Sequence, residues 1–154
     1  MAAFLEKERF AQIVAHTPLV SIDLIVKNSR GEVLLGKRMN EPAKGYWFVP
    51  GGRIYKNETI SQAFSRIAES EIGQEEAIEN AKFLGAYEHF YENSFCSEHI
   101  STHYVVLAYE LNCNLSAYVL PKAQHNDYKI VPVEVLLHDA KVHPNVKLYF
   151  KESK

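Results

Sequence analysis

The sequence predicts an α/β fold in which a mixed β-sheet lies between α-helices as an α/β/α sandwich. Apolar and alternating segments typical of strands, such as LVSIDLIVK at 19–27, occur on both sides of one long amphipathic helix. Short helix-like segments stand near both ends. The 154 residues contain no internal repeat or linker, so we expect a single domain over residues 1–154. A mixed sheet with helices on both faces accounts for this order.

The elements expected before the long helix are one helix and three strands. In chain order they cover residues 5–15, 19–27, 32–38 and 47–50. Thr17-Pro18 ends the first helix, because the residue before a proline disfavours helical backbone. Ser29-Arg30-Gly31 is a turn signal that makes the first two strands a hairpin. The third strand leads into the glycine pair Gly51-Gly52.

After the long helix, the chain predicts three more strands and two closing helices. The strands cover 83–92, 101–113 and 127–133, and the helices cover 133–139 and 144–152. Residues 120–127, LPKAQHND, are expected to form a loop before the last strand.

The long helix carries one residue that breaks its pattern. Asn57 or Thr59 can cap its start, and Gly73 is well placed to stop it. Its apolar residues recur at helical spacing: Ile60, Ala63, Phe64, Ile67 and Ala68. Glu71 falls on this apolar stripe, where a carboxylate is costly unless a partner receives it. A buried ion pair, a surface-reaching side chain and a functional carboxylate all remain open.

Composition argues against several classes of protein. With 17 Lys and Arg against 19 Asp and Glu, the net charge is −2, which argues against a broad nucleic-acid surface. Two cysteines are too few to staple a secreted domain. The first residues carry charges among their apolar side chains, and no run is long enough to span a bilayer. We therefore expect a cytoplasmic enzyme that binds no nucleic acid and no membrane.

Polar residues outside the helix suggest further chemistry. Arg38 ends a predicted strand and Arg53 follows the glycine pair, so both can reach one site, where planar guanidinium groups suit phosphate oxygens. Solvated surface arginines are the alternative. Gln124 places an amide oxygen, suited to a hard cation, beside His125, which suits a general base or a structural role.

Three residues on predicted strands are also candidates for the functional site. His89 and Tyr104 lie on the two long strands, where a polar strand face or a satisfied core partner is the alternative explanation. Asp23 stands alone within an apolar strand and needs a hydrogen-bond partner if it is buried. A sugar hydroxyl is one candidate partner, and a backbone amide is another.

The spacing of the long helix resembles the Nudix box of the Nudix hydrolase superfamily. Gly52, Glu58, Arg66, Glu71 and Gly73 match its fixed positions. Ile67 and Ser70 replace two glutamates of the box, and Gln74 replaces its final apolar residue. The resemblance implies the Nudix fold and a divalent metal bound to a pyrophosphate. The missing glutamates make a cluster of several metals on this helix doubtful.

A closer resemblance covers about residues 4–150. The segments TPLVSIDLIVKNSRGEVLLGKR, GYWFVPGGR, EHFYE, THYVVL and QHNDY are similar to the GDP-mannose mannosyl hydrolase branch of that superfamily. The branch departs from the box at the same two positions. The resemblance implies hydrolysis of a GDP-sugar to GDP and the free sugar with inversion at the anomeric carbon. The physiological sugar and the strictness for guanine stay open.

The resemblance also implies roles for single residues. One Mg²⁺, with Mn²⁺ as a possible substitute, would be held by the Gly51 carbonyl, Glu71 and Gln124. His125 would be the general base, and Arg38 and Arg53 would neutralise the departing diphosphate. Asp23, His89 and Tyr104 would lie at the sugar end. Phe4 and Phe10, from an amino-terminal segment that helps to form the nucleotide pocket of a homodimer, would stack on guanine.

Overall fold

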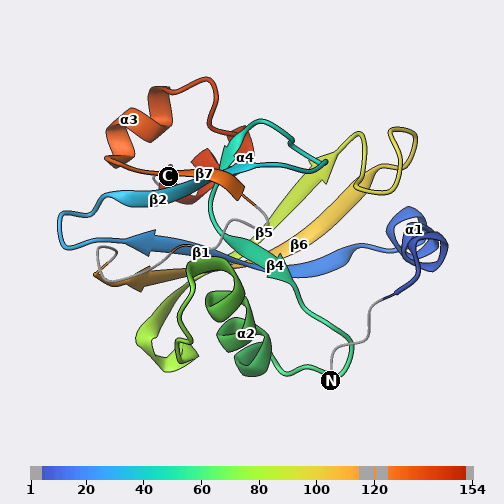
Figure 1. Cartoon of the computed structure of the whole chain (residues 1–154), viewed down its shortest axis with the longest axis horizontal. Coiled ribbons are helices and arrows are strands. Elements are labelled where there is room, and N and C mark those ends of the chain that lie inside the picture. Colours follow the sequence, from blue (N-terminus) through green and yellow to red (C-terminus); the bar gives the residue numbers. More distant parts are fainter. Residues whose placement is uncertain (1–4, 115–119, 121–124, 152–154) are drawn as a thin grey trace.

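The computed structural model describes residues 5–114, 120 and 125–151, which form one mixed sheet with helices on both faces (Figure 1). The helices are α1 (Lys7–His16), α2 (Ile60–Ile72), α3 (Val133–His138) and α4 (Pro144–Lys147), with 3-10 helices η1 (Ile78–Asn80) and η3 (Leu148–Phe150). The strands are β1 (Leu19–Lys27), β2 (Val33–Arg38), β3 (Trp47–Phe48), β4 (Gly51–Arg53), β5 (Ala81–Tyr91), β6 (Thr102–Asn112) and β7 (His125–Val131). The predicted α/β/α fold is confirmed.

The sheet is built around a parallel pair of strands that lie far apart in sequence. β1 and β6 run parallel, from the pair Leu19–Tyr104 to the pair Lys27–Asn112. The strand order is β3-β2-β1-β6-β5, while β4 pairs with β1 and β7 pairs with β2, all antiparallel apart from β1 and β6. Seven strands of both orientations make the sheet mixed, as the sequence predicts.

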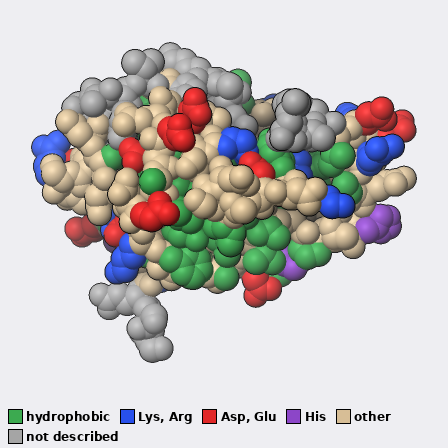
Figure 2. Space-filling view, turned by 90° about the horizontal axis from the view of Figure 1, so that it is seen from below, with side chains coloured by type: hydrophobic (Ala, Val, Ile, Leu, Met, Phe, Trp, Pro, Cys, Tyr) green, Lys and Arg blue, Asp and Glu red, His purple; other side chains and the backbone are tan. Residues whose placement is uncertain are grey.

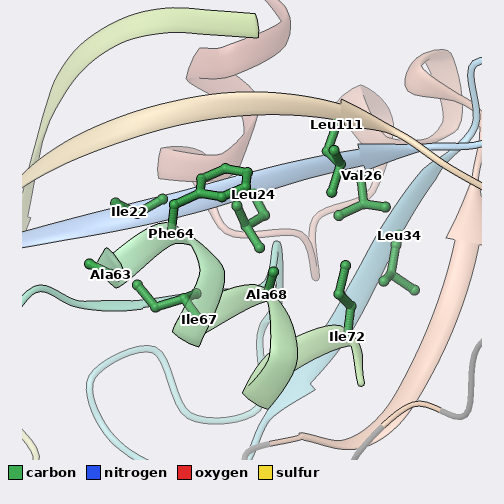
Figure 3. Packing of buried hydrophobic residues seen from close by; sticks show 10 residues of the cluster. All are labelled: Ile22, Leu24, Val26, Leu34, Ala63, Phe64, Ile67, Ala68, Ile72 and Leu111. Carbon is green, nitrogen blue, oxygen red and sulfur yellow. The ribbon is translucent and has the colours of Figure 1, made fainter. Parts of the chain in front are cut away.

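Each face of the sheet carries its own hydrophobic core. Figure 3 shows α2 lying against the sheet, with Phe64, Ala68 and Ile72 directed toward β1 and its neighbours. The opposite face is covered by α3, α4 and η3 through Leu136, Val146 and Tyr149. Burial on both faces explains why most residues of β1 are apolar.

The predicted signals at both ends of α2 are confirmed. The Thr59 hydroxyl accepts from the Gln62 amide at 3.0 Å, and the Gln62 side chain accepts from the Thr59 amide at 2.9 Å. This capping box satisfies two amides that have no partner within the helix. Gly73 has φ 78° and closes the helix through a bond from its amide to the Glu69 carbonyl.

The structure corrects four sequence predictions. The glycine pair was expected only to follow the third predicted strand, but Gly51–Arg53 forms a strand of its own, β4, because small residues let this backbone approach β1 closely. His125 is not in a loop but begins β7, since its backbone continues the pairing with β2 opposite Arg38. The expected last helix is divided into α4 and the 3-10 helix η3. The amino-terminal helix covers Lys7–His16 rather than 5–15.

The face on the α2 side leaves apolar surface uncovered. Figure 2, seen from that side, shows a patch of hydrophobic side chains. Exposed apolar residues include Phe83 and Phe90 on β5, which are 52% and 63% exposed. In the described part of the chain, no helix is long and apolar enough to cross a membrane.

Candidate active site

A cleft of about 580 Å³ opens where β1, β4, β5, β6 and α2 meet. This size is typical of small-ligand sites. Seven of the residues singled out from the sequence line it: Asp23, Arg38, Gly51, Arg53, Glu71, His89 and Tyr104. The structure therefore brings together residues that are spread over more than eighty positions of the chain.

Glu71 is buried on the wall of the cleft, with 4% of its surface exposed. Its Oε1 accepts a hydrogen bond from the amide of Gly51 at 3.2 Å. A Cβ on Gly51 would lie 2.3 Å from Asp23 Oδ1 and 2.7 Å from the Ile22 carbonyl oxygen. Only glycine therefore fits at this position. Gly51 contacts two carboxylates, because its amide bonds to Glu71 and its residue partner in the β1–β4 pairing is Asp23.

The donors near Glu71 suit one hard cation better than several. Within the described ranges, no group of three His, Cys, Asp or Glu side chains is placed to hold a metal ion. Ile67 and Ser70, which stand where the Nudix box has glutamates, line the same cleft. Mg²⁺ is commonly held by one or two carboxylates while phosphate oxygens and water complete its shell. The buried Glu71 carboxylate and the adjacent Gly51 backbone fit such a site.

Two arginines bring positive charge to the cleft. Arg38 is oriented by a bond from its Nε to the Pro42 carbonyl at 2.8 Å and lies 5.9 Å from the centre of the Phe48 ring. The Arg53 guanidinium lies 4.9 Å from the centres of both the Phe10 and Tyr55 rings. No described carboxylate forms a salt bridge with either arginine, so both can bind an anion.

Glu58 and Arg66 form a bidentate pair beside the cleft. Arg66 Nε and Nη2 donate to the two oxygens of Glu58 at 2.7 and 2.9 Å, and Nη2 also donates to the Arg53 carbonyl at 2.8 Å. Glu58 Oε1 accepts from the Tyr55 amide at 2.8 Å. The hydrogen bond with Arg66 is the main reason that the pKa of Glu58 is lowered. These bonds tie β4 and the following loop to α2.

The floor of the cleft is a chain of three buried polar side chains. Tyr149 donates from its hydroxyl to Asp23 Oδ2 at 2.5 Å, and the same hydroxyl lies 3.2 Å from His89 Nε2. Burial raises the pKa of Asp23 to about 7, although the Tyr149 bond and the Arg38 charge oppose this rise. Burial lowers the pKa of His89 to about 4. Asp23 thus has a side-chain partner that neither sequence-based alternative included.

Tyr149 itself was missed by sequence reasoning. It lies on η3 near the carboxyl end, 126 positions from Asp23, in a segment with no motif. The available signal was the isolated Asp23 in an apolar strand, which indicates that a distant polar partner exists without naming it. Tyr55 and Tyr91, which also line the cleft, were likewise not singled out.

Three predicted site residues lie wholly or partly outside the described residues, and a fourth lies on α1. Phe4 and Gln124 lie outside the described residues, as does the side chain of His125. The backbone of His125 is described and pairs with Arg38, which lines the cleft. Phe10 lies on α1 beside Arg53 and is half-buried. The proposed roles of these residues remain predictions.

Comparison with known proteins agrees with this architecture. The family model of the NUDIX domain matches residues 17–151. The low-salt glycan biosynthesis protein Agl8 of Haloferax volcanii is 41% identical over 144 residues, which cover 92% of this chain and 86% of that protein.

Solved structures with low identity share the fold. The MutT NUDIX hydrolase of Burkholderia pseudomallei has a TM-score of 0.70 at 20% identity, over 90% of this chain and 100% of that chain. The NUDIX domain of Shewanella oneidensis NrtR, solved with ADP ribose, has a TM-score of 0.66 at 19% identity, over 96% of each chain. With the family model spanning most of the sequence and the box spacing present from β4 through α2, this chain belongs to the NUDIX family.

Proposed function

We propose that this Nudix hydrolase cleaves a GDP-sugar, with GDP-mannose as the first candidate and GDP-glucose as the second, into GDP and the free sugar. The observation that carries the proposal is the composition of the cleft. One buried carboxylate from α2, two arginines, Asp23 and His89 line a single space, and Tyr149 joins Asp23 to His89 from behind. Charged groups suited to a diphosphate therefore lie beside acceptors suited to sugar hydroxyls.

A divalent ion, Mg²⁺ or Mn²⁺, would be held by Glu71, the Gly51 carbonyl and Gln124. The first two lie together in the cleft, and Gln124 is assigned by the family resemblance alone. When bound, the ion would supply positive charge to the diphosphate oxygens. The replacement of box glutamates by Ile67 and Ser70 supports a single ion rather than several.

The bond that breaks in this proposal joins the anomeric carbon to the diphosphate oxygen. The bonding electrons leave with the diphosphate, so negative charge grows on that group as an oxocarbenium-like sugar forms. Arg38 and Arg53 line the cleft and are held by neighbouring groups, so they meet this charge without large rearrangement. Stabilisation that grows toward the transition state accelerates the reaction.

Water completes the reaction by attacking the anomeric carbon from the opposite face, which inverts it. The water oxygen forms the new bond to carbon, and its proton passes to the general base. We assign this role to His125, whose backbone lies opposite Arg38 in the β2–β7 pairing. A neutral imidazole can accept such a proton near pH 7.

Hydrolysis in oxygen-18 water tests this proposal. Attack at carbon puts the label in the free sugar and gives GDP. Attack at phosphorus, the usual Nudix reaction, puts the label in a phosphate and gives GMP and a sugar 1-phosphate. The second result would replace our proposal with that of a pyrophosphohydrolase. Absence of any product with magnesium and a panel of GDP-sugars would indicate a domain that only binds nucleotide sugars.

We further propose that the protein is a homodimer, as the resemblance implies. The uncovered apolar side chains on β5, which include Phe83 and Phe90, offer a surface for a second copy. Sedimentation velocity of the wild-type chain should give a single dimer peak. A monomer peak at micromolar concentration would contradict this proposal.

A further inference from the structure

We propose that Tyr149 is a positioning residue for the sugar end of the cleft: its hydroxyl joins Asp23 to His89, and both of these side chains then present hydrogen-bond acceptors to the ligand. The inference rests on the proposed function and deepens it, because it says which chemistry the sugar must offer. Asp23 and His89 line the cleft, whereas Tyr149 supports them from behind.

The direction of the two hydrogen bonds follows from the groups involved. A phenol has one hydrogen to donate, and its oxygen can also accept. At pH 8, above the pKa of about 7 that burial gives Asp23, this carboxylate is ionised and can only accept. Burial and the neighbouring Asp23 raise the pKa of Tyr149, so the phenol stays protonated and donates a hydrogen bond to Asp23 Oδ2. Toward His89 Nε2 the same oxygen can then only accept, so the hydrogen of the neutral ring is assigned to Nε2.

The consequence for His89 is a fixed tautomer. A neutral imidazole carries one hydrogen, so a hydrogen on Nε2 leaves Nδ1 as an acceptor. The ring is neutral near pH 7, because burial and the nearby His143 lower its pKa to about 4. The second oxygen of Asp23, Oδ1, lies beside Gly51 at the wall of the cleft. The floor therefore offers acceptors, and a ligand placed there must supply hydroxyl donors.

Packing holds the tyrosine in this orientation. Tyr149 is 8% exposed, and its ring meets that of Tyr87 edge-on with centroids 4.7 Å apart. Asp23 and His89 are 7% and 2% exposed. A buried carboxylate and imidazole that lose their shared partner must turn or find another, and both changes alter the acceptors that face the sugar.

Nuclear magnetic resonance of the full-length, nitrogen-15-labelled chain tests the tautomer directly. At pH 8, where Asp23 is ionised, the long-range spectrum should show wild-type His89 as a neutral ring with its hydrogen on Nε2, assigned by the signals that disappear in His89→Gln. In Tyr149→Phe we expect a mixture of tautomers. A wild-type His89 with its hydrogen on Nδ1 would overturn the inference, even if the variant did not fold.

Kinetics provide the second test. Tyr149→Phe should lower kcat/KM for the GDP-sugar by about 10- to 100-fold, as expected for a lost bond to a charged group, while inhibition by GDP stays unchanged because GDP lacks the sugar. Tyr87→Phe is the matched control, because no hydrogen bond of the Tyr87 hydroxyl is found in the described part of the chain. Equal losses for GDP and GDP-sugar would mean a structural role only and overturn the inference. If wild type released no free sugar, the proposed function would fail, whereas the tautomer measurement would still decide this inference.

Discussion

Gly51→Ala should destabilise the protein, although alanine normally stabilises a site with ordinary backbone angles. Gly51 has no positive φ, so alanine would add about 0.4–1 kcal/mol of stability if its methyl group fitted. The new Cβ would instead lie 2.3 Å from Asp23 Oδ1 and 2.7 Å from the Ile22 carbonyl oxygen. The carbonyl belongs to the backbone of β1, so it can move only if the β1–β4 pairing distorts.

The size of the effect follows from three contributions. Overpacking costs about 1–3 kcal/mol, and weakening the bond from the Gly51 amide to the Glu71 carboxylate costs about 1.5–3 kcal/mol. After the gain from alanine is subtracted, we expect a net loss of about 2–5 kcal/mol. At about 2–4 °C per kcal/mol for a chain of this size, the Tm should fall by roughly 5–20 °C.

Urea unfolding and thermal melts measure this loss, with Gly52→Ala as the control. A Cβ on Gly52 would lie 3.1 Å from Ile67 Cγ1, a side-chain atom rather than a backbone atom, so we expect a smaller loss than for Gly51→Ala. If Gly51→Ala matched wild type, or lost less stability than Gly52→Ala, the close approach of β4 to β1 would not be what requires glycine.

Three further predictions address the base, the Glu58–Arg66 pair and pH. His125→Gln should lower kcat by roughly 10²–10⁴-fold while calorimetry shows unchanged binding of magnesium and GDP. Equal losses of turnover and of binding would make His125 a ligand or a structural residue. Arg66→Ala should lower the free energy of unfolding in urea by about 1–3 kcal/mol, because it breaks a bidentate, half-buried pair. Arg30→Ala, which removes the more exposed ion pair with Glu32, should lower it by less than about 1 kcal/mol. Similar losses for the two variants would contradict this reasoning. The raised pKa of Asp23, about 7, means that the folded chain holds more protons than the unfolded chain between about pH 4 and pH 7, so this carboxyl lowers stability as pH rises through that window. Asparagine does not titrate, so Asp23→Asn should become more stable relative to wild type by about 1–4 kcal/mol from pH 4 to pH 8. His89, with its pKa lowered to about 4, acts in the opposite direction between about pH 4 and pH 6.5, but it is present in both proteins and cancels in this comparison. A constant difference would refute the burial of the Asp23 charge.

Local signals in the sequence predict most of the fold. Helical spacing, the Thr59 cap and Gly73 define α2 because these rules act within a few residues. The alternation and apolar runs of β1, β5 and β6 also depend on near neighbours and the face they cover. β4 was not predicted, because two glycines carry no strand signal and pair only where β1 offers an edge.

The site was predictable where it follows a fixed spacing and not where it depends on tertiary contact. Glu71 stood out because a carboxylate on an apolar helical stripe is unusual, and it is buried at the cleft as that position implies. The identity of the Asp23 partner depends on how η3 folds back across the sheet, which no local pattern records. A single sequence therefore indicates that a buried charge needs a partner but does not identify it.

The parallel pairing of β1 with β6 has a consequence for how the protein is made. Residues 19–27 leave the ribosome well before residues 102–112, and at about 5–20 residues per second the delay is several seconds. During this time β1, whose side chains are almost all buried in the finished molecule, lacks its central neighbour. Its hairpin partner β2 is synthesised next and can pair with only one edge of β1. β1 therefore gains its parallel partner only after β6 has been made, and Asp23 gains its partner Tyr149 later still.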